Sequence, residues 1–288
     1  MRGSDGVPAP RSAGPQGCAE PLGHNGRVST FPLSSSPRIR DVIRHEGARR
    51  RHLVVLERTG LTDTLVRFTF GGDLEGFTSL GPEDHVKAFF AGRDGVVGRD
   101  YTPAEYRPIG ASSGPELDID VVVHGEAGPA TAWASRAGRG DELEIAGPRG
   151  SRLAATGFAN ALLLADPAGM PALRRWIRAL AGVLPVHAVL FGDDTRLADH
   201  LDQAEVFAAT PQLAPTADFD LLEVVRSQDV TADTFVWAAG EAGALIPVRR
   251  WLKQEVGLPK PNLSLHGYWK AGVAGLDHHA PLDPADPD

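Results

Sequence analysis

The quartet Arg99-Asp100-Tyr101-Thr102 carries residue types that could hold a flavin. An arginine pairs well with phosphate, an aromatic ring can lie against the face of an isoalloxazine, and a hydroxyl can hydrogen-bond to a ring heteroatom. The quartet lies in a run of strand-forming residues, and a strand also offers its backbone to the polar edge of the ring. These features predict a flavin-binding strand, although in isolation an ordinary barrel strand with a surface arginine has the same pattern.

A glycine-rich turn farther along the chain, Gly128-Pro129-Ala130-Thr131, could hold a diphosphate. Proline favours the first turn of a helix, so the sequence predicts a helix over 130–137 that starts here. Free backbone N–H groups and the positive end of the helix dipole bind anions at such a start. His124, which precedes the turn, is either a packed histidine at a strand end or a contact to the cofactor. In this order, the two motifs favour a flavin that carries a diphosphate.

Two turns in the second half of the chain are predicted to face a nucleotide. One is Asp166-Pro167-Ala168-Gly169-Met170-Pro171, which follows a short apolar run, and the other is Gly240-Glu241-Ala242-Gly243. Ligands of open α/β sheets bind outside the carboxyl ends of the strands, where both turns would lie. This position predicts a site without identifying its ligand. The turn Gly147-Pro148-Arg149-Gly150-Ser151 either closes a barrel or approaches the cofactor, with Arg149 adding positive charge.

The first part of the chain predicts an antiparallel barrel that would position the quartet and the glycine-rich turn. β-Branched and aromatic runs separated by short turns indicate six strands and leave little room for helices. These runs are 52–59, 64–70, 86–90, 99–109, 117–124 and 142–146.

After residue 151, strands and helices alternate, which predicts a parallel sheet with crossover helices. Apolar spacing predicts one helix through Trp176 and another through Val248, and the expected strands are 161–165, 186–191, 205–209, 235–239 and 263–266. The expected fold class is therefore β + α/β. An N-terminal antiparallel six-stranded flavin-binding barrel (49–155) is followed by a parallel-sheet α/β nucleotide-binding-like domain (156–275). Residues 1–48 and the acidic tail 276–288 are expected to be disordered.

Composition excludes several classes of protein. The 288 residues are 42% hydrophobic, enough for two cores, and the net charge of −8 argues against a nucleic-acid partner. No apolar run approaches the roughly 20 residues of a membrane span and no secretory signal is seen, so we expect a cytoplasmic protein with no membrane insertion. Cys18 is the only cysteine, which argues against an internal disulfide. We also expect a monomer without a metal site.

Common catalytic motifs give no better explanation of the sequence. The segment 110–114 fits G-x-S-x-G, but it lies in a loop before a barrel strand and lacks the strand-turn-helix context of a nucleophile elbow. The chain has no P-loop, no H-E-x-x-H and no G-x-G-x-x-G motif. We therefore expect no catalytic side chain, with the flavin itself carrying the chemistry.

The order of the motifs resembles that of the siderophore-interacting proteins, which are flavin-dependent ferric-siderophore reductases of the ferredoxin–NADP reductase superfamily. The resemblance covers about residues 50 to 275. It includes the Arg-x-Tyr-Thr quartet, the His-Gly-x-x-Gly-Pro-Ala turn before Trp133 and the Gly-Pro-Arg-Gly-Ser turn. Its most specific parts are Trp237-Ala-Ala-Gly-Glu241 and Gly267-Tyr-Trp-Lys270.

The resemblance implies FAD as the cofactor and assigns residues to its parts. The ring and phosphate side would be held by Arg99, Tyr101 and Thr102, and the ribityl chain and diphosphate by His124, Gly128, Pro129, Ala130 and Thr131. The nicotinamide or substrate side would include Asp166, Gly240 and Glu241, and a basic trough would include Lys270. Arg249 and Arg250 either lie behind Lys270 in this trough or form a solvated helix face. Many members have a second arginine where this chain has Ala104, with Arg107 a few residues later, which puts the details of flavin contact in question.

The implied function is reduction of Fe(III) in a ferric siderophore, which releases Fe(II) for intracellular iron assimilation. The electron donor could be NADH, NADPH or reduced ferredoxin, and the sequence does not identify it or the siderophore. The first alternative is a general NAD(P)H-dependent flavin oxidoreductase of the ferredoxin-reductase type. The second is a non-catalytic module that binds a siderophore or flavin.

Overall fold

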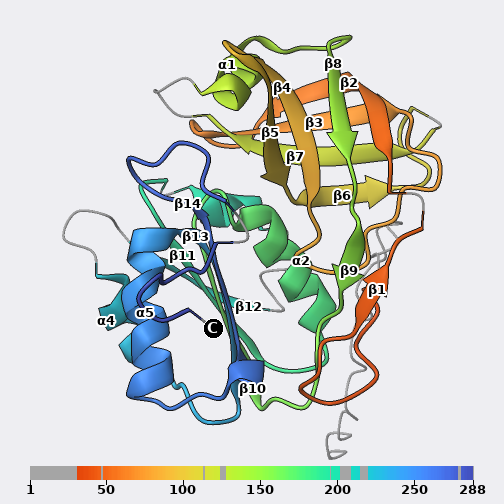
Figure 1. Cartoon of the computed structure of the whole chain (residues 1–288). Coiled ribbons are helices and arrows are strands. Elements are labelled where there is room, and N and C mark those ends of the chain that lie inside the picture. The colour runs from red at the N-terminus through yellow and green to blue at the C-terminus, as the bar shows by residue number, and fades with distance from the viewer. Residues whose placement is uncertain are drawn as a thin grey trace, which may run out of the picture.

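The structure of the protein is a computed structural model with two sheets stacked end to end (Figure 1). It describes residues 31–46, 48–112, 114–123, 128–194, 196–201, 209–214, 220–277 and 280–287. A seven-stranded antiparallel sheet forms the barrel, and a five-stranded parallel sheet forms the second layer. The β + α/β fold class expected from the sequence is confirmed.

The barrel is built from seven strands rather than the expected six. In the order in which they pair, they are β5 (Gly95–Tyr101), β4 (Val86–Gly92), β8 (Glu142–Ala146), β2 (Arg50–Gly60), β3 (Leu65–Gly72), β7 (Glu116–Val122) and β6 (Pro103–Arg107). The stretch expected as one strand, 99–109, is divided at Thr102 between β5 and β6. Proline at 103 has no N–H to continue the β5 ladder, so the chain leaves one edge of the sheet and starts the strand at the other edge.

Alternating burial along the strands places aromatic side chains inside the barrel. Phe68 and Phe70 on β3 are fully buried, as the period-two pattern of the sequence predicts. Helix α1 (Pro129–Arg136) covers one end of this core (Figure 1), and the Trp133 ring lies 4.9 Å from the Phe68 ring and 5.8 Å from the Phe90 ring. The aromatic core therefore fixes α1 against β4, the strand that pairs with β5.

The parallel sheet has the strand order β12 (Ala209–Ala214), β11 (Val186–Phe191), β10 (Asn160–Ala165), β13 (Thr234–Glu241) and β14 (Leu263–Trp269). Its central strands are almost entirely apolar, because helices cover both faces. One face packs against α2 (Met170–Leu180), and the other packs against α4 (Leu221–Arg226) and α5 (Ala242–Gln254). Two short 3-10 helices, η1 (Leu197–His200) and η2 (Lys260–Asn262), lie in the connections. The strand expected at 205–209 falls mostly outside the described residues, and β12 begins at its last residue.

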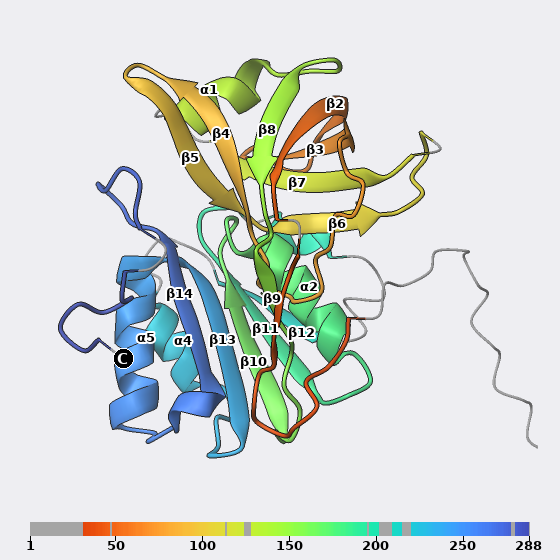
Figure 2. The same ribbon diagram turned by 45° about the vertical axis from the view of Figure 1, so that its right-hand side comes forward.

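Part of the N-terminal extension that was expected to be disordered is folded against the rest of the chain. Strand β1 (Val42–Arg44) pairs with β9 (Gly150–Arg152), and Phe31 and Leu33 pack against the core beside α2 (Figure 2). The guanidinium of Arg40 lies 4.8 Å from the Trp176 ring. Disorder through residue 48 is therefore wrong for residues 31–46, while residues 1–30 lie outside the description.

The acidic tail also differs from the expectation of disorder. Leu282 packs against the core under α5, and Asp283 accepts a 3.0 Å hydrogen bond from Arg250 Nη2. Residues 280–287 thus have a defined position along α5. Within the described part of the chain, no helix has the length and apolar character needed to cross a membrane.

Candidate functional site

The quartet predicted to bind a flavin lies at the junction between the barrel and the parallel sheet. Tyr101 ends β5, and its ring meets the Phe90 ring edge-on at 6.1 Å. Burial raises the pKa of the Tyr101 phenol, which keeps it neutral. Thr102 is 8% exposed, and its hydroxyl lies beside the phenol of Tyr268 near the end of β14. The expected flavin seat is therefore in direct contact with the edge of the parallel sheet.

Arg99 lies on β5 with its guanidinium beside the hairpin that follows β14. Its Nη1 donates a 2.8 Å hydrogen bond to the carbonyl of Gly98, and a Cβ at Gly275 would come 3.5 Å from its Nη2. Arg99 pairs with no carboxylate among the residues that the structure describes. Its positive charge is therefore available to a phosphate or another anion, as the FAD assignment requires.

The start of α1 offers a second anion-binding position, and this helix packs against the hairpin that carries Arg99. Gly128 is the N-cap and has no side chain that could cap the first N–H groups of the helix, and a Cβ there would meet no atom within 4 Å. Pro129 lies near the turn that joins β4 to β5, since a Cβ at Gly92 would come 3.7 Å from its Cγ. Thr131 is buried, and Ala130 packs against the aromatic core. His124 lies outside the described residues, so its role stays a prediction.

These two positions fit a flavin dinucleotide. Arg99 lies on β5, the uncapped helix start lies against the β4–β5 hairpin, and the Phe90 ring contacts both Tyr101 and Trp133. The free N–H groups at this helix start suit a diphosphate. Bound there, FAD would supply an electron carrier whose ring end lies near Tyr101 and Thr102.

Asp166 joins the ends of three elements of the parallel-sheet domain. It is 2% exposed, and its Oδ1 accepts hydrogen bonds from Ala168 N at 2.8 Å and Gly169 N at 3.2 Å. Its Oδ2 accepts from Glu241 N at 2.9 Å and from Trp269 Nε1 at 2.6 Å. Burial raises the pKa of the carboxyl to about 6, against the opposing effect of these hydrogen bonds.

Gly240 is required next to Asp166 because no side chain fits there. A Cβ at this position would lie 2.6 Å from Asp166 Oδ2 and 2.8 Å from the Phe191 ring. The absence of a side chain lets β13 approach the carboxylate at the carboxyl end of β10. Because β10 and β13 are neighbours at the point where the strand order reverses, Asp166 and Gly240 lie where open α/β sheets bind ligands.

Glu241 holds two backbone segments together. Its Oε2 caps α5 by accepting from Ala244 N at 2.7 Å, and its Oε1 accepts from Ala271 N at 3.1 Å. It therefore anchors the hairpin over residues 270–275, which begins with Lys270. Lys270 is exposed and forms no ion pair with a described residue, so its charge faces solvent beside the junction.

The two arginines expected behind Lys270 are engaged elsewhere. Arg249 is 5% exposed and pairs with Asp286 at 2.8 Å, and Arg250 pairs with Asp283 at 2.5 Å. The acidic tail thus neutralises both charges, which corrects the expectation that they extend the basic trough. This pairing was not predictable, because the tail has no regular hydrophobic period that would indicate a packed segment.

Arg107 does not replace the arginine that is missing at Ala104. Its guanidinium lies 2.8 Å from Asp118 and 3.2 Å from Glu116, and these carboxylates raise its pKa. Ala104 itself is 2% exposed within β6. Of the two arginines on β5 and β6, Arg99 is therefore the one that stays available to a cofactor.

Arg175 is a site residue that the sequence analysis missed. It lies on α2, is 2% exposed, and donates to three barrel groups, the carbonyls of Pro103 and Gly81 at 2.9 and 2.6 Å and Ser79 Oγ at 2.8 Å. Burial lowers the pKa of its guanidinium to about 10, so it stays charged at neutral pH. Two of its acceptors are backbone carbonyls, so no residue type in the sequence marks its partners.

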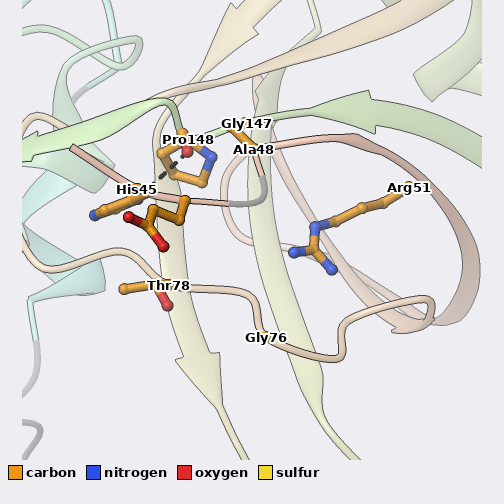
Figure 3. A pocket seen from close by; sticks show the side chains of 8 residues that line it. His45, Ala48, Arg51, Gly76, Thr78, Gly147 and Pro148 are labelled. Atoms are coloured by element: carbon orange, nitrogen blue, oxygen red, sulfur yellow. Dashed lines mark hydrogen bonds between the residues drawn. The ribbon is translucent and has the colours of Figure 1, made fainter.

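The Gly147–Ser151 turn closes the barrel against the N-terminal segment. Its Pro148 carbonyl lies 3.3 Å from His45 Nδ1, and Ser151 Oγ donates to Asp84 at 2.5 Å and lies 3.0 Å from His45 Nε2. Figure 3 shows His45, Pro148 and Arg51 around the cavity beside this turn, which has room for a water molecule but not for a cofactor. Arg149 is exposed. These contacts favour the structural interpretation of the turn.

Comparison with known proteins gives the same assignment for both halves of the chain. Residues 92–152 match a family model described as the siderophore-interacting FAD-binding domain, and residues 158–272 match one described as the siderophore-interacting protein. The chain is 32% identical over 264 residues to the NADPH-dependent ferric-chelate reductase of Escherichia coli, covering 83% of this chain and 100% of that protein. It is 25% identical to the ferric vibriobactin reductase ViuB of Vibrio cholerae, over 80% of this chain and 92% of ViuB.

A solved structure extends the similarity to the fold. A siderophore utilization protein from T. fusca has a TM-score of 0.73 and 32% identity, and the match covers 84% of this chain and 100% of that one. The resemblance inferred from the motifs is therefore confirmed, and the chain belongs to the siderophore-interacting protein family.

Proposed function

We propose that this protein is an FAD-dependent ferric-siderophore reductase that converts Fe(III) to Fe(II) for intracellular iron assimilation. The observation that supports the proposal most is the contact between Thr102 and Tyr268, because it would bring a flavin held at Thr102 close to the end of β14, which Lys270 follows. The names of the relatives from Escherichia coli and Vibrio cholerae, ferric-chelate reductase and ferric vibriobactin reductase, support the same reaction.

The reaction needs an electron carrier rather than a nucleophile or a general base. A flavin accepts a hydride from a nicotinamide and can pass on its two electrons one at a time, so one hydride suffices for two Fe(III) ions. Siderophores hold Fe(III) through hard oxygen donors, and Fe(II) is held more weakly, so an electron releases the metal. The work left to the chain is to bind FAD through Arg99 and the start of α1 and to attract an anionic ferric complex through Lys270.

For the electron donor we propose NADPH before NADH or reduced ferredoxin, because the relative from Escherichia coli is described as NADPH-dependent. Residues 49–155 would then bind FAD and residues 156–275 the donor, with Asp166, Gly240 and Glu241 at the edge that faces it. We further propose that the protein acts in the cytoplasm, where these donors are found, and acts as a monomer. Size-exclusion chromatography with light scattering tests the last point.

Anaerobic turnover of the FAD-loaded protein tests the function. With NADPH, NADH or reduced ferredoxin as donor, a ferric siderophore and a dye that binds Fe(II), we expect Fe(II) to appear at a rate well above that of free FAD plus donor. Equal rates with ferric siderophores and with soluble dyes would assign the chain to general flavin oxidoreduction. Purified protein that stays colourless after incubation with FAD would favour a binding module.

A further inference from the structure

Strand β1 has one edge that pairs with no other strand in the part of the chain that the structure describes. It forms a two-stranded sheet with β9, in which Leu153 N donates to the carbonyl of Asp41 at 2.9 Å and His45 N donates to the residue before β9 at 3.0 Å. Backbone groups of an antiparallel strand alternate in direction, so the odd-numbered residues bond toward β9 and the even-numbered ones face away from it. The N–H and carbonyl groups of Val42 and Arg44 are therefore left for another strand.

The outward face of this ribbon carries apolar and cationic side chains. Val42 is 62% exposed, and the residue opposite it on β9 is Arg152. Directly opposed residues share a face, as do alternate residues of one strand, so Val42, Arg44 and Arg152 lie together on one face. Ser151 lies on the other face and is buried. Just before the strand, Ile39 is also largely exposed. A partner would therefore meet aliphatic side chains next to arginines.

The arginines of this face differ from their neighbours because they have no counterion among the residues that the structure describes. Of the six arginines between positions 38 and 51, five pair with a carboxylate, and the exception is Arg44. Arg149 and Arg152 are exposed and form no ion pair with a described residue either. Asp41 is engaged by two hydrogen bonds from the preceding turn, and Glu46 lines the cavity shown in Figure 3. On a chain with a net charge of −8, this local positive charge favours an anionic partner.

The ribbon is remote from the candidate functional site. Figure 1 shows β1 and β9 on the side of the molecule away from the hairpin that follows β14. A partner bound to the free edge of β1 would leave Lys270 and the proposed flavin seat accessible. The surface is therefore suited to docking rather than to chemistry.

We propose that the free edge of β1 docks an extended segment of a partner protein that carries both acidic and apolar residues and adds as a strand beside β1. Such a strand would pair its backbone with Val42 and Arg44. Its residues opposite these two would lie two positions apart on the outward face, where an apolar residue suits Val42 and a carboxylate suits Arg44. A lipid headgroup offers no row of N–H donors for the free carbonyls, so the edge favours a peptide. The inference goes beyond the proposed function and does not depend on it.

Calorimetric titration of the full chain with synthetic peptides tests the proposal. The probe is a blocked peptide of the repeated sequence Glu-Thr-Val-Thr, which places glutamate and valine alternately on one face of a strand. One control peptide has lysine in place of glutamate, and another has N-methyl groups on its valines, which prevent backbone pairing. The protein variants are Arg44→Gln and Val42→Pro. Their matched controls are Arg93→Gln, on the exposed turn between β4 and β5, and Val42→Ile, which keeps the N–H.

We expect the wild type to bind the glutamate peptide with a Kd below about 1 mM and to bind neither control peptide. Arg44→Gln should raise this Kd about threefold at low salt, because an exposed ion pair is lost. Val42→Pro should raise it about tenfold, because a backbone donor is lost at the edge. The N–H of Val42 has no partner in the described chain, so proline should leave thermal unfolding unchanged. Both control variants should bind like the wild type.

Several outcomes would overturn the proposal. Equal binding of the lysine or N-methylated peptide would exclude recognition by charge or by strand pairing. Vesicles of phosphatidylglycerol and phosphatidylethanolamine that bind through Arg44, without peptide binding, would assign the face to a lipid surface. A dimer in light scattering that Val42→Pro abolishes would assign the edge to a second copy of this chain. Binding of neither peptide nor vesicle would mean that the arginines only protect a short edge strand from pairing. Should Val42→Pro unfold, Arg44→Gln and the N-methylated peptide still decide the question.

Discussion

The guanidinium of Arg175 donates a 2.9 Å hydrogen bond to the carbonyl oxygen of Pro103, which links helix α2 to the barrel residue that follows Thr102. The same side chain binds the carbonyl of Gly81 at 2.6 Å. Thr102 in turn lies beside Tyr268, and Trp269 Nε1 donates a hydrogen bond to Asp166 just before α2. These contacts surround the junction, so the position of the proposed flavin seat depends on the parallel-sheet domain.

Replacing Arg175 with methionine should therefore reduce both stability and cofactor binding. Methionine fills much of the volume but leaves the carbonyls of Pro103 and Gly81 buried without a donor, so we expect a loss of about 3 kcal/mol in the free energy of unfolding. FAD affinity should fall with it because the strand after Thr102 is no longer held. Urea unfolding and a fluorescence titration with FAD measure the two effects.

The control for this change is Arg196→Met, which removes an arginine with an exposed side chain that pairs with Asp199. Exposed pairs contribute little, so its stability should stay within about 0.5 kcal/mol of the wild type. An Arg175→Met protein as stable as Arg196→Met, with unchanged FAD binding, would show that the clamp on Pro103 has no such role.

The parts of the fold that were predictable from sequence are those whose burial follows a period. The alternation through Phe68 and Phe70 and the apolar run of β10 each reflect the solvent exposure of their own side chains. Strand β1 has three exposed residues and exists through its pairing with β9, far along the chain. A local pattern reports burial and not a distant partner, so β1 was missed.

In the candidate site, too, the residues with a local signal were predictable and those that depend on distant partners were not. Arg99 and Gly128 were found because their residue types match the chemistry of a flavin and a diphosphate. Arg175 was missed because it binds backbone carbonyls at Pro103 and Gly81, and a backbone acceptor leaves no residue type in the sequence to mark it. The break at Thr102 was available in principle from Pro103, which cannot continue the ladder of β5.

Asp166 should make stability depend on pH with an unusual sign. Burial raises the pKa of its carboxyl from the usual 3.8 to about 6, so the fold favours the protonated form. The contribution of Asp166 to the free energy of unfolding is fully present below about pH 4 and is lost as the pH rises through about 6. The loss amounts to about 3 kcal/mol.

Comparison with Asp166→Asn isolates this contribution from those of other acids. In the variant, the lost acceptor at Oδ2 changes the free energy of unfolding by an amount that does not depend on pH, and residue 166 no longer titrates. We expect the stability of the wild type relative to Asp166→Asn to decrease between about pH 4 and about pH 7.5, measured by urea unfolding at each pH. A difference that stays constant over this range would mean that the carboxyl titrates normally.

Arg99→Ala should weaken FAD binding without weakening the fold. Arg99 has no carboxylate partner in the described part of the chain, whereas a charge-assisted bond to a phosphate contributes enough that its loss raises the Kd of FAD by about tenfold or more. Flavin fluorescence measures the affinity, and thermal unfolding of the FAD-free protein measures the fold. Arg93→Ala, on the exposed turn of the same hairpin, is the matched control and should leave both unchanged. Equal FAD affinities for the two variants would remove Arg99 from the flavin seat.

Lys270→Ala should separate attraction of the substrate from binding of the cofactor. Lys270 is exposed beside the flavin seat, so removing its charge should raise the KM for an anionic ferric complex by about threefold at low salt and reduce its dependence on ionic strength. FAD affinity should not change, because Arg99 and the start of α1 hold the cofactor. Lys260→Ala is the control, since Lys260 is equally exposed but lies in η2, before the opposite end of β14. Steady-state reduction at several salt concentrations compares the two variants, and identical KM values and salt slopes would place the anionic substrate away from this hairpin.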